Sequence, residues 1–166
     1  MEKREFYDIN GNPTGITYYK GDPIPDGYYV MVVMICLQNS DGYFLMQKRS
    51  PIKGGNCGVT GGHPKAGETP LQGIITEVRE EIGLDIEGMP LKLFAEGRNG
   101  KACYKMYYLK MDIDIDSLVL QKEEVSAVRW FSAEELKKLI DNNELIQNHA
   151  TCIKECFNYL NSGAKE

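Results

Sequence analysis

The longest apolar run in the chain covers residues 28–38 and reads YYVMVVMICLQ. A strand that is buried on both faces carries such a run, whereas a strand with one solvent face alternates apolar and polar residues. We therefore expect a central strand over residues 28–38. The turn-forming residues 39–42 then lead into a second predicted strand over residues 43–48.

A different period marks the first predicted helix, which begins at Thr69. Pro70 suits the first helical position, and Thr69 with Gln72 forms a capping-box pattern. Gly83 is a typical residue at a helix C-terminus. Between these ends, apolar residues recur with the helical spacing of one stripe, at positions 71, 74, 75, 78 and 82.

The remaining pattern predicts further strands and two more helices. Asn99-Gly100 is a hairpin turn signal between predicted strands over 91–98 and 101–111. A short strand is expected over 125–131, followed by a helix with a capping box at Ser132 and a last helix over about 147–160. Residues 51–67 are rich in Gly and Pro and are expected to form a loop, and residues 1–27 a β-hairpin extension. This order favours an α+β sandwich with helices packed on a mixed sheet.

Composition narrows the function classes. The 166 residues are expected to form one domain, with a hairpin extension over 1–27, a core over 28–145 and a C-terminal helix over 146–166. The net charge of -5 argues against a binder of nucleic-acid backbones, and no run is long enough to cross a membrane. Five scattered cysteines and no secretory signal favour reduced thiols and a cytoplasmic protein.

Three glutamates on the first helix are the strongest chemical signal. Glu77, Glu80 and Glu81 fall within an arc of roughly 100°, on the side opposite the apolar stripe. Like charges at these spacings repel one another, but clustered carboxylates form a site once Mg²⁺ binds. Glu68 adds a fourth carboxylate near the start of the helix. A solvated acidic face is the alternative interpretation.

The spacing around these glutamates resembles the Nudix box. Gly62 is followed after five residues by Glu68, and seven residues later comes the segment TEVREEIGL over 76–84. The Nudix pattern has Arg-Glu-apolar-any-Glu-Glu-any-Gly-apolar at that point. All defined positions match, including Gly83, except that Thr76 replaces the arginine. The resemblance covers about residues 28–145.

This resemblance implies an α/β/α sandwich and Mg²⁺- or Mn²⁺-dependent hydrolysis of a diphosphate bond in a nucleoside diphosphate linked to another group, or a related small molecule. By the same resemblance, Glu77, Glu80 and Glu81 hold the metal and act in catalysis, with the carbonyl of Gly61 as a further ligand. Glu68 would support the loop.

Several positions keep alternatives open. By the resemblance, Glu124 completes the metal site or acts as the base, but a surface glutamate is equally consistent with the sequence. Arg49 and Lys53 are candidates for binding substrate phosphates, or are ordinary surface charges. Thr76 cannot orient glutamates as an arginine would, which predicts a weakened enzyme or a nucleotide-binding module without turnover.

A third function class comes from the segment Gly62-His63-Pro64. It resembles the isopentenyl-diphosphate isomerase branch of the same fold, in which the histidine binds metal. That branch needs a cysteine directly before the glycine, and here the position is Gly61. Hydrolysis is therefore favoured over isomerisation. The expected partner is a small diphosphate substrate, and the hairpin and Tyr-rich strand are candidates for a homodimer contact.

Overall fold

A central parallel pair of strands organises the main sheet. The computed structural model describes residues 1–163, and in it β3 (Val30–Gln38) pairs in parallel with β8 (Ala102–Lys110) along its whole length. β7 (Lys92–Asn99) precedes β8 in the chain and pairs with it in the antiparallel hairpin that the Asn-Gly turn predicted. On its other side β3 pairs with β6 and β4, and β4 with β5 and β9. These strands are β4 (Phe44–Arg49), β5 (Cys57–Gly58), β6 (Thr60–Gly62) and β9 (Val125–Phe131).

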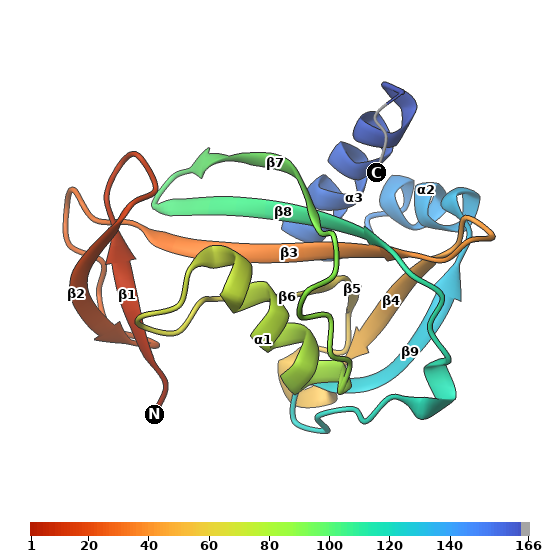
Figure 1. Ribbon diagram of the computed structural model, residues 1–166, viewed down its shortest axis with the longest axis horizontal. Coiled ribbons are helices and arrows are strands. Elements are labelled where there is room, and N and C mark those ends of the chain that lie inside the picture. The colour runs from red at the N-terminus through yellow and green to blue at the C-terminus, as the bar shows by residue number, and fades with distance from the viewer. Residues whose placement is uncertain (164–166) are drawn as a thin grey trace.

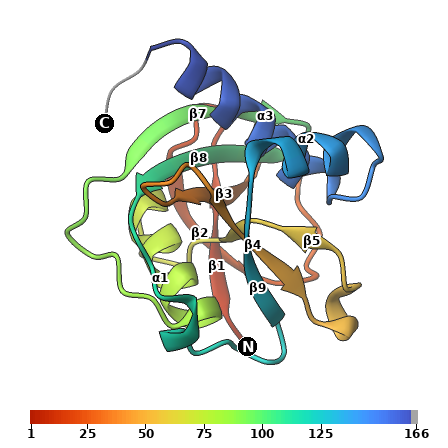
Figure 2. The ribbon, with the colours of Figure 1, turned by 90° about the vertical axis from the view of Figure 1, so that its right-hand side faces the viewer.

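Helices cover both faces of this sheet, as Figures 1 and 2 show. Alternate residues of β3 face different helices. Val33, Ile35 and Leu37 pack in one core cluster with α1 (Pro70–Ile82). Met34 and Cys36 pack in the other cluster, which includes buried residues of α2 (Ala133–Asp141) and α3 (Gln147–Asn161). The predicted sandwich of a mixed sheet between helices is confirmed, and so is the doubly buried central strand.

Local capping sets the ends of the helix that carries the glutamates. The Thr69 side chain accepts a hydrogen bond from the Gln72 amide, and the Gln72 side chain accepts one from the Thr69 amide. Gly83 ends the helix with φ of 69°, a left-handed conformation in which a side chain would be strained. The predicted capping box at Ser132 also forms, at the start of α2.

The N-terminal segment forms the predicted hairpin, from β1 (Lys3–Tyr7) and β2 (Pro13–Tyr19). Two backbone hydrogen bonds between Tyr7 and Tyr29, of 2.8 and 2.9 Å, join it to the start of β3. The Ala66 amide also donates to the Lys3 carbonyl at 2.9 Å. The hairpin is therefore anchored both to the main sheet and to the loop that precedes α1.

The prediction of one long loop over residues 51–67 is wrong in part. A 3₁₀ turn (Pro51–Lys53), β5 and β6 all form within it, and a second 3₁₀ turn (Ile115–Ser117) follows β8. Gly and Pro argue locally against strands, but β6 is held by pairing with β3, a contact that local composition does not encode. Residues 164–166 of the predicted C-terminal segment lie outside the described residues.

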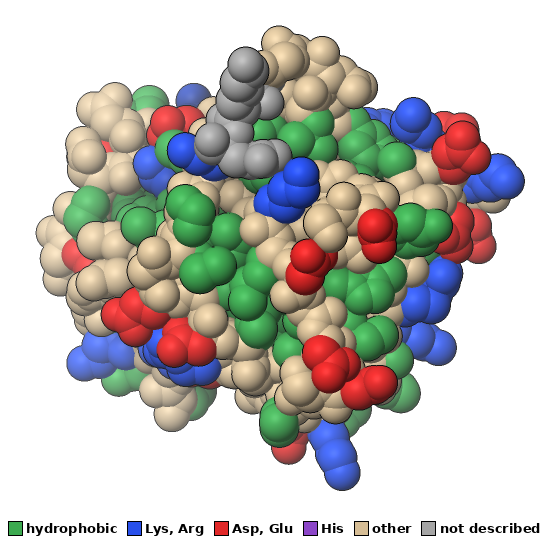
Figure 3. All heavy atoms as spheres, turned by 45° about the vertical axis from the view of Figure 1, so that its right-hand side comes forward, with side chains coloured by type: hydrophobic (Ala, Val, Ile, Leu, Met, Phe, Trp, Pro, Cys, Tyr) green, Lys and Arg blue, Asp and Glu red, His purple; other side chains and the backbone are tan. Residues whose placement is uncertain are grey.

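The surface carries mixed charges. On the face shown in Figure 3, acidic and basic side chains are interspersed with hydrophobic ones. No helix within residues 1–163 is both long and apolar enough to span a membrane.

Candidate functional site

A polar cleft of about 330 Å³ brings the predicted site residues together. Its walls come from the hairpin, β3, β4, β6, α1 and the start of α3, together with the 3₁₀ turn and the segment before β9. Of the residues selected from the sequence, it contains Arg49, Lys53, Gly61, Gly62, Glu77, Glu80, Glu81 and Glu124, and also His63.

Glu77 and Glu81 are buried at the cleft, with 9% and 7% of their surface exposed. The sequence placed all three glutamates opposite the apolar stripe, and for these two that expectation is wrong. On a helical wheel Glu81 lies only about 20° from Ile74, so it turns toward the sheet with the apolar residues. Of the three glutamates, only Glu80 is exposed.

Burying two carboxyl groups side by side changes their acidity. Burial raises the pKa of Glu77 to about 9, helped by a hydrogen bond with Glu81 and by repulsion from Glu81 and Glu80. Burial also raises the pKa of Glu81. The pair therefore tends to retain a proton unless a positive charge compensates it.

A buried chain of hydrogen bonds orients Glu81. The Thr60 hydroxyl donates to Gln47 Oε1 at 2.8 Å, and Gln47 Nε2 donates to Glu81 Oε1 at 2.9 Å. Gln47 is only 5% exposed although it is polar, and it follows three buried apolar residues of β4. No local sequence signal could have identified it, because the charged residues Lys48 and Arg49 follow it in the same strand.

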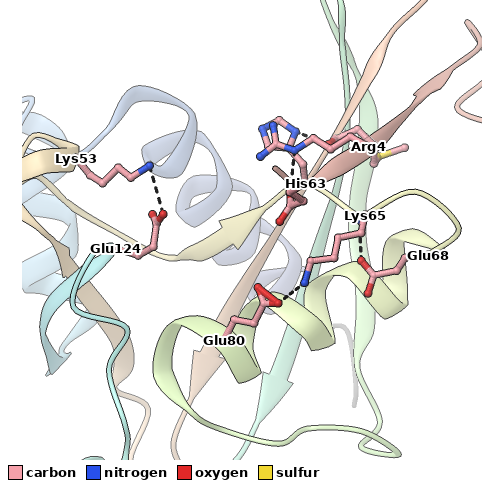
Figure 4. Close-up of polar contacts among 9 residues, drawn as sticks. Arg4, Lys53, His63, Lys65, Glu68, Glu80 and Glu124 are labelled. Carbon is pink, nitrogen blue, oxygen red and sulfur yellow. Dashed lines mark hydrogen bonds and ion pairs between the residues drawn. The ribbon is translucent and has the colours of Figure 1, made fainter. Parts of the chain in front are cut away.

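Glu80 and Glu68 are held by the loop before α1, as Figure 4 shows. The Lys65 ammonium forms an ion pair with Glu80, and the Lys65 amide donates to Glu68 at 2.7 Å. Thr76 donates its hydroxyl proton to the other oxygen of Glu68 at 2.5 Å. Thr76 therefore contacts Glu68, whereas the sequence argument considered the glutamates at 77 and 80 as partners of that position.

Two glycines allow the backbone to approach the carboxyl groups. A Cβ atom on Gly62 would lie 2.4 Å from the carboxyl carbon of Glu77, and one on Gly61 would lie 2.7 Å from the Val33 carbonyl. No real side chain tolerates such distances. A side chain at Gly61 would therefore collide with the backbone, and one at Gly62 would displace the Glu77 carboxyl group.

Two neutral histidines line the cleft with opposite hydrogen-bonding character. His63 Nδ1 lies 2.9 Å from the Met31 carbonyl, which can only accept, so Nδ1 carries the hydrogen and Nε2 keeps its lone pair. The Val59 amide donates to His149 Nδ1 at 2.9 Å, so His149 carries its hydrogen on Nε2. Burial lowers the pKa of each imidazole to about 4. His63 therefore offers an acceptor and His149 a donor.

The cations of the cleft come from segments that are far apart in sequence. Arg49 ends β4, and Lys53 forms an ion pair with Glu124 at 3.3 Å. Sequence reasoning missed Arg4 and Lys20 of the hairpin, which also line the cleft. Neither carries a local motif, because only the folded hairpin brings them to this position.

The carboxylate oxygens of the cleft are the kind of ligand that a hard divalent cation prefers. They do not converge on one point in this structure. Within residues 1–163, no group of three or more His, Cys, Asp or Glu side chains is arranged to hold a metal ion. The paired Glu77 and Glu81 have raised pKa values even though Arg49 acts on Glu81, and Mg²⁺ prefers carboxylate oxygens. Glu80 would have to leave Lys65 to join them.

Comparison with known proteins extends the match beyond the short motif. The NUDIX domain model matches residues 28–152. An uncharacterised Nudix hydrolase of Listeria monocytogenes is 32% identical over 153 residues, which cover 88% of this chain and 89% of that protein.

Solved structures share the fold at lower identity. The crystal structure of DR0079 from Deinococcus radiodurans superposes with a TM-score of 0.78 at 22% identity, covering 94% of this chain and 99% of that one. The NUDIX domain of Shewanella oneidensis NrtR, in complex with ADP ribose, superposes with a TM-score of 0.64 at 16% identity, covering 80% and 88%. Since the family model and the relative both span most of the chain, this protein belongs to the Nudix hydrolases, enzymes that cleave diphosphate bonds.

Proposed function

We propose that this protein is a Mg²⁺- or Mn²⁺-dependent hydrolase of a small diphosphate compound, such as a nucleoside diphosphate linked to another group. The observation that carries the proposal is the pair of buried carboxyl groups, Glu77 and Glu81, in a cleft that also contains Arg49 and Lys53. Acidic groups for cations and basic groups for phosphates are the two components that diphosphate hydrolysis needs.

In this proposal Glu77, Glu80 and Glu81 hold the metal, with the Gly61 carbonyl as a further ligand. The bound cation would neutralise charge that develops on the diphosphate oxygens. Gln47 fixes the orientation of the Glu81 carboxyl through its 2.9 Å hydrogen bond.

Groups at the rim of the cleft would act on the substrate and on water. Arg49 has a planar guanidinium that suits two phosphate oxygens at once. Glu124 lines the cleft beside Lys53, and we assign it the role of accepting a proton from the attacking water or completing the metal site. Glu68 supports the loop through its bonds to Lys65 and Thr76.

The test is a phosphate-release screen with and without Mg²⁺, across nucleoside triphosphates, nucleotide sugars, ADP-ribose, dinucleotide cofactors and isoprenoid diphosphates. Glu81→Gln should abolish the Mg²⁺-dependent turnover found for the wild type. Glu155→Gln is a matched control, because Glu155 is exposed on α3 and does not line the cleft. Full turnover by Glu81→Gln would remove the carboxyl pair from the mechanism.

The screen also separates two other functions. Tight ligand binding without turnover of any compound would indicate a binding module, a function that the Lys65–Glu80 ion pair would suit because it occupies one predicted ligand. Conversion of isopentenyl diphosphate without phosphate release would indicate an isomerase.

A further inference from the structure

The N-terminal hairpin adds positive side chains to the cleft beyond Arg49 and Lys53, which the sequence selected. Arg4 on β1 and Lys20, directly after β2, line the cleft together with Lys53 of the 3₁₀ turn. We call Arg4, Lys20 and Lys53 the hairpin cation group. Figure 4 shows Arg4 beside His63, on the hairpin side of the cleft.

Backbone contacts fix the position of the hairpin. The Lys3 carbonyl accepts from the Ala66 amide at 2.9 Å, and Tyr7 exchanges two backbone bonds with Tyr29. Because side chains alternate along a strand, Arg4 points to the face opposite Lys3. Arg4, which lines the cleft, thus comes from an element that is anchored to the loop before α1.

The acidic groups nearby do not neutralise this group fully. Arg4 Nε contacts Glu2 at 3.0 Å, and Lys53 contacts Glu124 at 3.3 Å. Lys20 has no ion pair among the described residues. The pKa of Lys20 is lowered chiefly by the nearby ammonium group of Lys53. Glu124 raises this pKa, but it has the smallest effect of the groups that act on Lys20. The charges of Lys20 and Lys53, from separate segments, therefore repel each other, and Glu124 offsets this only in part.

The hairpin cation group lies apart from the carboxyl pair. In Figure 4, Arg4 and Lys53 lie away from Glu80 on α1, the helix that also carries Glu77 and Glu81. Arg49, in contrast, acts on the charge of Glu81. The cleft thus has one cation beside the proposed metal ligands and a separate group at the hairpin.

The rest of the lining suits a hydrophilic ligand. None of the described residues that line the cleft is Phe, Tyr or Trp, so it offers no aromatic surface on which a nucleobase could stack. Its volume of about 330 Å³ is at the small end for small-molecule sites. Guanidinium and ammonium groups are the side chains that recognise phosphate oxygens.

We propose that Arg4, Lys20 and Lys53 bind a second phosphate group of the substrate, separate from the diphosphate that is cleaved. Preferred substrates are then small, hydrophilic diphosphates that also carry a phosphomonoester. This inference rests on the proposed function, which puts the scissile diphosphate at Glu77 and Glu81.

The test uses three probes on the full chain. Methylenediphosphonate with Mg²⁺ reports the metal and diphosphate site, and inorganic phosphate titrated into that complex reports the second site by amide chemical shifts of the hairpin. 5-Phosphoribosyl 1-diphosphate, with Ca²⁺ replacing Mg²⁺ to prevent hydrolysis, carries both groups on one small sugar. We expect it to bind at least about tenfold tighter than methylenediphosphonate under the same conditions, since one charge-assisted contact contributes that much.

A double variant, Arg4→Gln with Lys20→Gln, should weaken phosphate binding about tenfold or more and remove the advantage of the phosphoribosyl compound. Lys3→Gln, which removes a charge from the same strand but not from the cleft, should leave both unchanged. Thermal melts check that each variant folds.

Two results would overturn the inference: no saturable phosphate binding by the wild type, or an equal loss in Lys3→Gln. If methylenediphosphonate binds with Mg²⁺ and phosphate does not, the second site fails while the proposed hydrolase stands. If methylenediphosphonate itself does not bind, the proposed function fails first.

Discussion

When divalent cations are absent, the free energy of unfolding should fall as the pH rises from about 7 to about 8. The cause is the buried carboxyl pair. The pKa of Glu77 is raised to about 9 in the folded chain, chiefly by burial, whereas an unfolded chain has a glutamate pKa of about 4.3. Between these values the folded state holds one more proton than the unfolded state, so the free energy of unfolding falls with increasing pH.

The magnitude follows from that one proton. Each pH unit within the window should cost about 1.4 kcal/mol, a large part of the stability of an ordinary domain. The histidines act in the opposite direction at lower pH. Burial lowers the pKa of His63 and His149 to about 4, so their neutral folded forms add stability that is lost as the pH falls below about 6.5. Above pH 7 that contribution is almost complete and the carboxyl slope remains.

The assay is urea denaturation followed by circular dichroism in EDTA, at three pH values between about 7 and about 8. Wild type and the Glu155→Gln control should lose stability along this series. Glu77→Gln should show a shallower slope, because only Glu81 then has a raised pKa, and should be more stable than wild type at the highest pH. Saturating Mg²⁺ should remove the slope in wild type, because the cation replaces the proton. A flat wild-type series in EDTA, or a Glu77→Gln variant less stable than wild type at pH 8, would refute the reasoning.

Three further predictions concern the groups around the pair. Gly62→Ala should weaken Mg²⁺ binding by at least about tenfold in calorimetry, since its Cβ would force the Glu77 carboxyl aside from 2.4 Å; an unchanged affinity would contradict the packing argument. Thr76→Val should lose about 1.5–3 kcal/mol of unfolding free energy because Glu68 loses its 2.5 Å hydroxyl donor, while Thr76→Ser should retain most of it; equal stability of the two variants would count against this role. His149→Phe should cost about 1–3 kcal/mol by leaving a backbone amide without its acceptor, and a neutral effect on the urea midpoint would show that the 2.9 Å bond contributes little.

The parts of the fold that could be predicted from the sequence are those with local signals. The ends of α1 follow from Thr69, Gln72 and Gly83, whose caps form through bonds within a few residues. β6 could not be predicted, because a glycine-rich segment becomes a strand only through its pairing with β3, which lies well before it in the chain (Ile35 with Thr60, Met34 with Gly61).

The same distinction holds for the candidate site. The spacing of the box predicted which glutamates share a helix face, but it did not predict that two would be buried while Lys65 holds the third. Gln47 and Arg4 join the cleft from separate strands, and no periodicity links positions so far apart. A helical wheel gives the direction of each side chain around one helix. Burial depends on which residues of the sheet pack against that side of the helix.

The parallel pairing of β3 with β8 has a consequence for how the chain reaches its folded state. Val30 pairs with Ala102, a separation of 72 residues, and the glutamate helix lies within the intervening segment. Contacts of such long sequence separation close slowly, because the chain loses the entropy of a large loop before the pairing is gained. The helix can therefore form early from its own caps, while the apolar cluster that it shares with β8 is completed only when the last central strand arrives. Stopped-flow refolding should then show helix signal before the step that completes the core.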